Sequence, residues 1–356
     1  MTHRYLFLCP DRTSASGGIA VIYDTVVLLN RAGYDAAIVH NGPSAGYPDY
    51  PFDIPAFYTR RMHQAEWHWI GPRKKLRSIT HRVTNLIRPR RLRPLKLRPT
   101  DVIVTPEFML PEALTAFGAH PVAVFVQNPF AMMRAHDRAV ARGLDPSGQV
   151  LFWLSIADVC GRHLDMLGAR NVTYLPVSMK PEDFPFKARK QDLITYMPRK
   201  RPWEARIIDH ALRSRGRLGS YRLEALDGIP RAEVARKLGE SRIFISLLKT
   251  EALGFPAAEA MASGAIVVGF DGLGCAEYFD DSTGIPVTEG DVAGVVAAVE
   301  RVIADYAVDP DPFDAMRSRA AQRVREKYSV ERFEKGIREA WARLEAVLEA
   351  ETAAGK

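Results

Sequence analysis

The stretch RIFISLLKTEALGFPAAEAMASGAIVVGF, residues 242–270, combines two apolar runs of strand length with a short helical segment between them. RIFISLL and AIVVGF are expected to be buried strands. Pro256 suits the first turn of a helix, so PAAEAMASG is expected to be the helix that connects them. Two carboxylates, Glu251 before this helix and Glu259 in its first turn, therefore lie near the buried middle of a domain. A buried charge needs a partner, and residues 250–264 contain almost no other polar residue.

The same alternation of strand and helix runs through the rest of the chain. Strands are expected at residues 4–9, 35–40, 101–106, 122–127, 149–155, 171–177 and 192–197. Helices are expected at residues 18–33, 111–118, 158–169, 203–216, 231–240 and 291–307. This alternation predicts an α/β fold with two parallel sheets, each flanked by helices, in a pair of doubly wound Rossmann-like domains.

The two domains are expected to meet near residue 180. SMKPEDFPFKARK, residues 178–190, is polar, contains two prolines and is typical of a linker, and the alternation restarts after it. The predicted domains are residues 1–178 and 179–333, followed by a helix at residues 334–356. Ligands of such sheets bind outside the carboxyl ends of the strands, so the site is expected in the cleft between the domains.

Cysteine usage and hydropathy limit the class of protein. Cys9, Cys160 and Cys275 are far apart and odd in number, which favours neither a disulfide framework nor a structural zinc site. The apolar part of the first residues is too short for a signal peptide, and no apolar run reaches the length of a membrane span. We expect a cytoplasmic protein, with peripheral attachment to the inner face of the cell membrane as an option.

The net charge of +7 comes from one segment. Residues 73–98 hold eleven Lys or Arg and no acid. Apolar residues at helical spacing within this segment, preceded by two tryptophans, predict a basic amphipathic helix. Two interpretations stay open for residues 67–98: a solvated loop, and docking on an anionic membrane surface or an anionic acceptor. Nucleic acid is not expected as a partner, because the chain has no zinc-finger or RNP-type motif.

Two glycine-containing turns are expected to hold an anion. Gly17 and Gly18 immediately precede one helix, and Gly254 and Phe255 present backbone N–H groups at the start of another. A helix N-terminus supplies free N–H groups and a partial positive charge, which suit phosphate. Neither the G-x-G-x-x-G of dinucleotide binders nor the GK[ST] of a P-loop is present, which argues against a nicotinamide dehydrogenase and a P-loop kinase.

The two acids lie on either side of the second of these helix starts. Carboxylates accept hydrogen bonds from pairs of sugar hydroxyls, so an anion site between Glu251 and Glu259 suits a nucleotide diphosphate sugar. In the alternative, Glu259 only stabilises a helix N-terminus and Glu251 is an incidental loop residue. The spacing alone leaves both interpretations open.

The segment EALGFPAAEAMASG, residues 251–264, with AIVVGFDGLGCAEYF after it, resembles the E-x7-E signature of retaining GT-B glycosyltransferases of the group 1 type, family 4. The resemblance extends to SGG at residues 16–18, MPRKR at 197–201 and YSVERF at 328–333. It implies a GT-B fold whose C-terminal helix packs back on the first domain. That helix has an apolar face at spacings of three and four, made of Ile337, Trp341, Leu344 and Leu348.

The resemblance also implies a role for each matched residue. Glu259 would hold the ribose hydroxyls, and Glu251 would contact the donor sugar near the reacting carbon. Gly254 and Phe255 would meet the diphosphate or the sugar through their backbones.

Three consecutive cations match the family's leaving-group site. Arg199 and Lys200 stand where the family places the residues that neutralise the diphosphate, with Arg201 as a substitute for Lys200. Fixed cations stabilise the charge that builds there without a metal. No D-x-D pattern lies at a suitable strand end, so neither an essential metal nor a cofactor is expected.

The chain departs from the family after residues 122–126. Many members carry His or Asp there, whereas this chain has Gln127 and Asn128. An amide binds a hydroxyl but is not a base, so Asn128 is expected to face the donor sugar without removing a proton. This is compatible with front-face substitution, in which the donor's own phosphate oxygen takes the acceptor proton. His40 and His163 are expected to serve packing or a surface contact.

Together these observations predict a retaining, metal-independent hexosyltransferase that moves a sugar from a nucleotide donor to a surface glycan or lipid-linked glycan at the membrane. Two alternatives remain. One is a GT-B sugar epimerase or phosphorylase, and the other is a nucleotide-sugar-binding, membrane-docking protein without catalysis.

Overall fold

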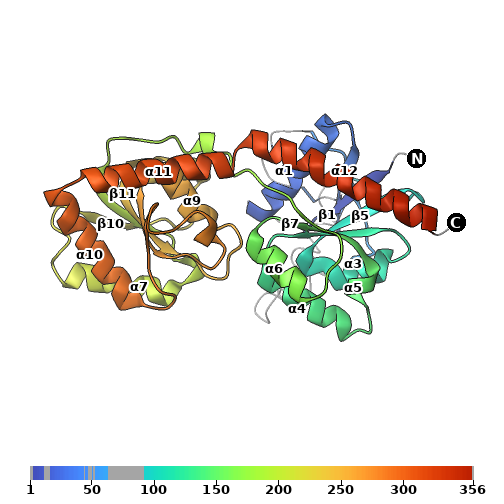
Figure 1. Ribbon diagram of the computed structural model, residues 1–356, viewed down its shortest axis with the longest axis horizontal. Coiled ribbons are helices and arrows are strands. Elements are labelled where there is room, and N and C mark those ends of the chain that lie inside the picture. Colours follow the sequence, from blue (N-terminus) through green and yellow to red (C-terminus); the bar gives the residue numbers. More distant parts are fainter. Residues whose placement is uncertain are drawn as a thin grey trace. The chain divides into compact units, whose positions relative to one another are not determined.

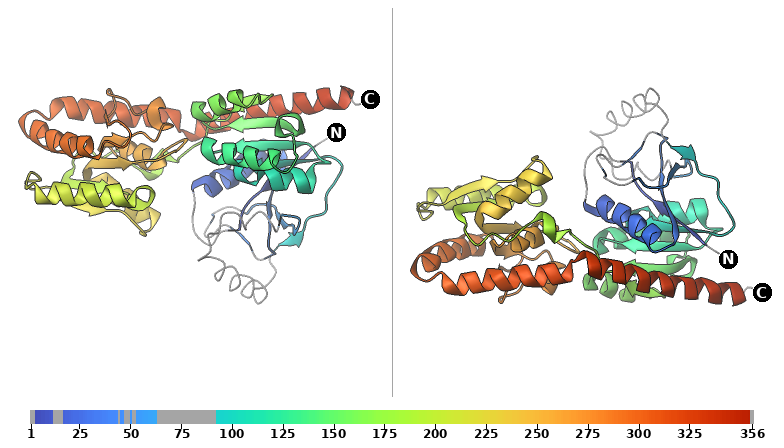
Figure 2. Two further views of the ribbon diagram at one scale, coloured as in Figure 1. Left: turned by 90° about the horizontal axis from the view of Figure 1, so that it is seen from below. Right: turned by 90° about the horizontal axis from the view of Figure 1, so that it is seen from above.

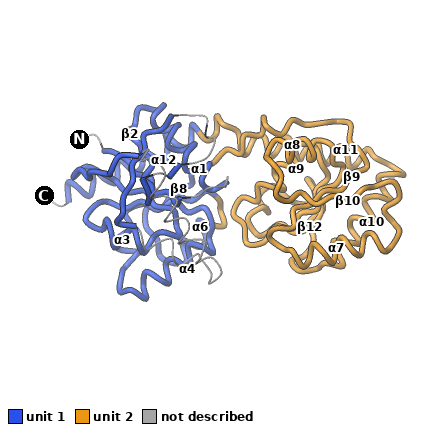
Figure 3. The backbone as a smooth tube through the Cα atoms, turned by 180° about the vertical axis from the view of Figure 1, so that it is seen from behind, with its two compact units in different colours: residues 1–156, 160–175, 334–356 blue, residues 157–159, 176–333 orange. Residues whose placement is uncertain are grey.

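The computed structural model describes residues 3–11, 17–43, 45–46, 50, 53–62 and 92–354. The chain forms two compact units (Figure 3). The first unit comprises residues 1–156, 160–175 and 334–356, and the second comprises residues 157–159 and 176–333. The chain thus leaves the first unit after Leu175, and residues from Glu334 onward return to it.

The first unit is built on a parallel sheet whose described strands follow the order β4-β3-β2-β1-β5-β6-β7-β8. Every residue of β1, β5 and β6 is buried, as their continuous apolar runs require of strands covered on both faces. The strands are β1 (Arg4–Leu8), β2 (Asp35–His40), β3 (Ala56–Tyr58), β4 (Arg93–Pro94), β5 (Asp101–Pro106), β6 (Val122–Val126), β7 (Val150–Ser155) and β8 (Val172–Tyr174).

Helices cover both faces of this sheet (Figures 1 and 2). Figure 1 draws α1 and α12 above the strands and α3, α4 and α5 below them. The helices of this part of the chain are α1 (Gly17–Arg31), the 3-10 turn η3 (Glu107–Met109), α3 (Leu110–Phe117), α4 (Pro129–Val140), α5 (Pro146–Gln149) and α6 (Asp158–Met166).

The C-terminal helix α12 (Val330–Ala354) closes one face of the first sheet. Trp341 is fully buried, with its ring 5.9 Å from that of Phe7 in a stacked arrangement and 5.7 Å from that of Tyr5 in an edge arrangement. Tyr5 and Phe7 are two positions apart on β1, so both side chains point to the same face of the sheet, which the helix covers. Glu345 of the same helix accepts a hydrogen bond from the Tyr5 hydroxyl. The predicted return of this helix to the first domain is confirmed.

The second unit contains a smaller parallel sheet in the order β10-β9-β11-β12-β13. Helices α9 and α11 pack together on one face, and α7 and α10 pack together on the other (Figure 1). The strands are β9 (Gln191–Tyr196), β10 (Arg222–Ala225), β11 (Ser241–Leu247), β12 (Ile266–Phe270) and β13 (Ile285–Pro286). The helices are η4 (Pro181–Asp183), η5 (Pro198–Lys200), α7 (Pro202–Ser214), α8 (Arg231–Glu240), α9 (Phe255–Ala262), η6 (Cys275–Glu277), α10 (Val292–Val308) and α11 (Asp311–Lys327).

The predicted strands and helices that fall on described residues are present, and the two Rossmann-like domains are confirmed. The elements that were not predicted include α4, β10 and α11, together with the short elements β3, β4, α5 and β13 and the 3-10 turns. The strand β10 is short, and Leu223 is its one buried residue. The buried face of α11 is formed by two alanines, Val324 and Arg317, so its sequence shows no apolar stripe. An Asn followed by Pro is a typical start of a helix, and this pair stands at the start of α4. Asn128 was instead interpreted from the sequence as a residue of the donor site.

The predicted basic amphipathic helix and the two tryptophans before it lie outside the described residues. Only the end of the basic segment, residues 92–98, is described, and it includes the edge strand β4. Within the described part of the chain, none of the helices combines the length and the apolar character needed to cross a membrane.

The burial of Trp341 predicts that Trp341→Ala destabilises the first unit. Removing a fully buried aromatic side chain costs about 3–5 kcal/mol through lost burial and the cavity left behind. Differential scanning calorimetry should show a clear fall in the unfolding temperature of that unit. Arg343→Ala is the matched control, because Arg343 is exposed on the same helix and its loss should change stability by less than about 0.5 kcal/mol. Equal effects from both variants would contradict the packing described here.

Candidate functional site

The second unit has a topological switch point between β9 and β11. The chain leaves β9 toward β10 on one side and returns through α8 to β11 on the other. Loops at the carboxyl ends of β9 and β11 therefore diverge and leave room for a ligand. The predicted acids and cations of this domain lie on these two loops and on the helix that follows β11.

Glu251 and Lys200 meet across this switch point. Lys200 Nζ lies 2.8 Å from Glu251 Oε1, and the two side chains are 44% and 22% exposed. The Glu251 N–H donates to the Gly272 carbonyl at 3.0 Å, which fixes the backbone of the loop after β11 beside the loop after β12. The backbone hydrogen bond thus fixes the position of Glu251, and its carboxylate forms an ion pair with Lys200. The carboxylate remains partly exposed and accessible to a ligand.

The turn into α9 depends on Gly254. This residue has a left-handed backbone with φ of +57°, and a Cβ there would lie 1.9 Å from Cys275 Sγ. The buried Tyr278 hydroxyl donates to the carbonyls of Leu253 and Gly254, both at 2.9 Å. Among the described residues, neither the Gly254 nor the Phe255 N–H has a hydrogen-bond acceptor. The start of α9 thus presents two free donors in a rigid turn.

Glu259 is buried and is paired with an arginine. It is the fifth residue of α9, so the prediction that it lies in the first turn is wrong: the helix begins at Phe255, directly after the left-handed Gly254. The residue is 7% exposed, and Arg231 Nη1 donates to its Oε1 at 2.9 Å. Burial raises the pKa of Glu259 to about 7, and Arg231 acts in the opposite direction. Arg231 is therefore the partner that the buried charge requires.

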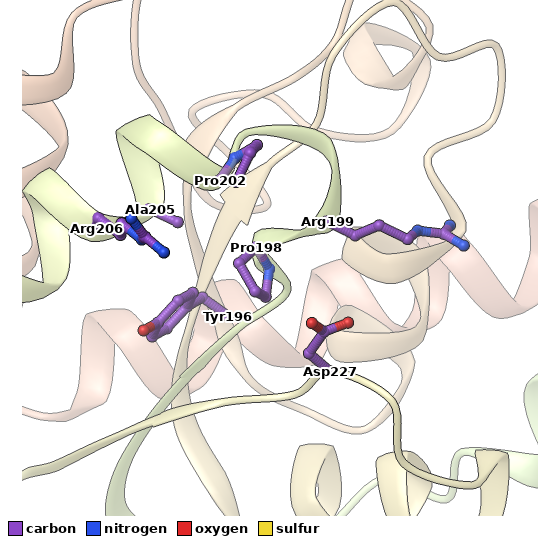
Figure 4. Close-up of a pocket in the computed structure, with 7 residues that line it drawn as sticks. All are labelled: Tyr196, Pro198, Arg199, Pro202, Ala205, Arg206 and Asp227. Atoms are coloured by element: carbon purple, nitrogen blue, oxygen red, sulfur yellow. The ribbon is translucent and has the colours of Figure 1, made fainter. Parts of the chain in front are cut away.

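Arg199 is a free cation beside a hollow (Figure 4). It is exposed, and its guanidinium makes no hydrogen bond or ion pair with a described residue. The hollow has a volume of about 290 Å³ and lies at the carboxyl ends of β9 and β10. Its other polar lining includes Tyr196, Arg206 and Asp227. Figure 4 shows the Arg199 side chain extending away from Tyr196 and Arg206, with the Asp227 carboxylate below it. Arg206 and Asp227 belong to no sequence motif, so they were not predicted as site residues.

Arg201 has a structural role, unlike Arg199 and Lys200, which directly precede it. It is 3% exposed, and its Nε donates to the Leu248 carbonyl at 3.0 Å. Its other nitrogens pair with Glu204 and Glu289, and its guanidinium lies 4.6 Å from the ring centroid of Phe270. Since these donors are committed to protein acceptors, Arg201 is not a free substitute for Lys200. It ties the loop after β9 to the end of β11.

The first unit carries a second group of candidate residues at the carboxyl ends of its strands. Gly17 and Gly18 were predicted to lie immediately before α1. In the structure they are its first two residues. Gln127 Nε2 donates to the Gly18 carbonyl at 3.1 Å, and a Cβ on Gly18 would lie 3.0 Å from Gln127 Oε1. The loop after β6 therefore lies directly against the N-terminus of α1.

Asn128 caps α4, a structural role that was not predicted for it. Its Oδ1 accepts from the Ala131 N–H at 2.9 Å, as in an N-cap. The buried Glu107 accepts from the Gln127 N–H at 3.1 Å, and burial raises the pKa of Glu107 to about 7. His40 is also buried, and its Nε2 lies 2.8 Å from the Tyr23 hydroxyl. These hydrogen bonds help to fix the loops of this unit.

Comparison with known proteins gives one family match and one curated relative. Residues 207–305 match the family model described as Glycosyl transferases group 1. Over 221 residues the chain is 28% identical to an alpha-1,6-glucosyltransferase of Actinobacillus pleuropneumoniae serotype 7 (strain AP76). That match covers 58% of this chain and 64% of the relative, so it spans less than two thirds of the relative's length.

Solved structures share the fold at low sequence identity. Anabaena Alr3699/HepE in complex with UDP and glucose matches with a TM-score of 0.65 and 12% identity, over 96% of this chain and 99% of that one. A mutant of S. aureus TarM in complex with Fondaparinux, alpha-GlcNAc-glycerol and UDP matches with a TM-score of 0.66 and 10% identity, over 97% and 99%. Sucrose-phosphate synthase of Thermosynechococcus elongatus gives 0.62 and 13%, over 97% and 99%. The expected GT-B fold is confirmed.

The contrast between Arg201 and Arg199 predicts opposite outcomes on stability. Arg201→Ala should destabilise the second unit by about 2–3 kcal/mol, because the buried Leu248 carbonyl and two carboxylates lose their donor. Arg199→Ala should change stability by less than about 0.5 kcal/mol, since its guanidinium has no partner among the described residues. Native-state hydrogen exchange of the β9 and β11 amides measures both. Equal protection in the two variants would show that Arg201 does not hold these loops together.

Proposed function

We propose that this chain is a retaining glycosyltransferase that transfers a glucosyl group from UDP-glucose to a glycan or lipid-linked acceptor. The observation that carries the proposal is the pair of carboxylates, Glu251 and Glu259, placed with free donors of the α9 N-terminus at the switch point of the second unit. The name of the curated relative and the UDP and glucose bound in a structural neighbour support the choice of donor.

The proposed donor site assigns one group to each part of the nucleotide sugar. Glu259 accepts hydrogen bonds from the ribose hydroxyls, and Glu251 contacts the glucosyl group near its reacting carbon. The free N–H groups of Gly254 and Phe255 and the unpaired guanidinium of Arg199 bind the diphosphate. A charged acceptor or donor in each of these contacts makes the hydrogen bonds about twice as strong as neutral ones.

The proposed reaction breaks the bond between the anomeric carbon and the diphosphate oxygen and forms a bond from that carbon to an acceptor hydroxyl. The acceptor proton passes to the donor's own phosphate oxygen, on the same face. The amides that follow β6 are engaged in holding loops of the first unit, which supports this route for the proton. Arg199 and Lys200 stabilise the negative charge that grows on UDP, and neither a metal nor a cofactor is required. The curated relative is named for an alpha linkage, and UDP-glucose carries an α-linked sugar, which supports retention of configuration.

The acceptor side of the proposal rests on the first unit and on the basic segment. Gly17 and Gly18 present the first turn of α1 beside Gln127, at the carboxyl ends of the strands. Residues 67–98 attract an anionic acceptor or the anionic inner face of the cell membrane, where each bound Lys or Arg contributes about 1 kcal/mol. A lipid-linked or surface glycan would be bound through this segment.

The test of the proposed function is UDP release from UDP-glucose. We expect release to require a glycan acceptor, the new linkage to be alpha, and the rate to be unchanged by EDTA. Release of UDP without an acceptor, or interconversion of the donor sugar, would favour an epimerase. Loss of activity in EDTA that magnesium or manganese restores would contradict the assignment of charge stabilisation to Arg199 and Lys200. The absence of UDP binding would reject the donor site itself.

Substitutions of Glu259 and Glu251 are expected to have different effects on donor binding and on kcat. Glu259→Gln should weaken UDP-glucose binding about tenfold and leave kcat nearly unchanged, because the ribose contact is the same in the ground state and the transition state. Glu251→Gln should lower kcat about a hundredfold with a smaller change in KM, because its contact strengthens as the sugar becomes positive. Glu233 is a partly exposed acid on α8, so Glu233→Gln is the control and should change neither. Equal and small effects at Glu251 and Glu259 would support the interpretation of both as structural residues.

A further inference from the structure

Arg231 connects the buried Glu259 to the segment that leads into the second unit. It is the first residue of α8, and it lies 28 positions before Glu259 in the sequence. Its Nη1 donates to Glu259 Oε1 at 2.9 Å, and its Nη2 donates to the Met179 carbonyl at 3.2 Å and to Asp183 at 3.4 Å. Its guanidinium also lies 4.7 Å from the centre of the Phe184 ring. Four contacts therefore fix its orientation.

The contact with Arg231 uses only one oxygen of Glu259. Among the described residues, Oε2 of Glu259 accepts no hydrogen bond. A carboxylate held through one oxygen has a defined orientation, and its second oxygen remains an acceptor for a ligand hydroxyl. The pairing also matters for charge, since burial favours the protonated form of Glu259 and Arg231 favours the ionised form.

Few other charges act on this carboxylate. Helix α9 packs against α8, α11, β11 and β12. Asp183 on η4 also raises the pKa of Glu259. Arg325 of α11 donates to the Ala262 carbonyl at the other end of α9, Arg242 of β11 pairs with Asp192, and β12 has no charged residue. The balance at Glu259 is thus set by burial, Arg231 and Asp183.

We propose that Arg231 is a positioning residue for the donor, which favours the ionised form of Glu259 and orients its Oε2 toward the ribose of the nucleotide. This inference rests on the proposed function, in which Glu259 holds the ribose hydroxyls. An ionised carboxylate accepts from both hydroxyls of a diol, whereas a protonated one loses an acceptor site and presents a competing donor. Donor affinity therefore depends on a residue that does not touch the donor.

The experiment is calorimetric titration of the full-length protein with UDP from about pH 6 to about pH 9. The terminal phosphate of UDP itself titrates at a pKa of about 6, which changes UDP binding in every variant. The measured quantity is therefore the ratio of the dissociation constants of variant and wild type at each pH, in which this effect cancels. For Arg231→Gln we expect UDP binding about tenfold weaker at neutral pH, since the pKa of Glu259 rises when the cation is lost. The ratio should fall toward one as the pH rises and ionises Glu259.

Three further variants separate positioning from a merely structural role. Arg231→Lys keeps the charge and should restore most of the affinity at neutral pH. Asp183→Asn removes the negative neighbour, so the pKa of Glu259 falls and UDP binding below neutral pH should improve relative to wild type. Arg236→Gln is the matched control on α8, where Arg236 is exposed and pairs only with Glu233 and Glu240 among the described residues, and should give a ratio of one throughout.

The outcomes distinguish this inference from the proposed function. A ratio for Arg231→Gln that is the same at every pH would assign Arg231 to structure alone and overturn the inference, as would no improvement with Asp183→Asn. Hydrogen exchange of the α8 and α9 amides shows whether the Arg231→Gln variant is folded. If that variant is unfolded, Arg231→Lys and Asp183→Asn are used to test the inference. If the wild type binds no UDP at any pH, the proposed function fails, whereas UDP binding with a flat ratio rejects only the role of Arg231.

Discussion

The guanidinium of Arg201 joins the two loops from which the candidate site of the second unit is built. It donates to the carbonyl of Leu248 at the end of β11 and pairs with Glu204 at the start of α7 and with Glu289. Because it is almost completely buried, separating these loops would leave a desolvated charge without partners, which is strongly unfavourable. Arg199 and Lys200 directly precede it, so the position of both cations depends on this tie.

The charged residues of the site differ in how their charge is satisfied. Arg201 and Glu259 are buried and bound to other parts of the chain, whereas Lys200 and Glu251 form a partly exposed pair and Arg199 has no partner among the described residues. Buried pairs resist reorganisation, and exposed charges exchange their contacts with water or ligand at little cost. The arrangement thus combines a rigid frame with groups that are ready to bind an anion.

The sequence was sufficient to predict the alternation of strands and helices and the return of the C-terminal helix. The alternation follows from apolar periodicity and from turn residues, which are local properties of the chain, whereas the return of the helix was expected from the resemblance to GT-B glycosyltransferases. Strand β10 and helix α11 were missed because neither has an apolar stripe, and their places are fixed by packing against the sheet. The acids Glu251 and Glu259 were recognisable because they interrupt an apolar stretch.

Only the tertiary structure decided what these residues do to one another. Arg199, Lys200 and Arg201 are consecutive in sequence, yet one is free of described partners, one pairs with Glu251 and one is buried. The partner of Glu259 could not be read from the chain, because Arg231 lies on another helix and belongs to no motif. The sequence alone determined which groups are present and the order of the main strands and helices. The folding of α8 against α9 determined which charges meet, since ionic contacts act through space and not along the chain.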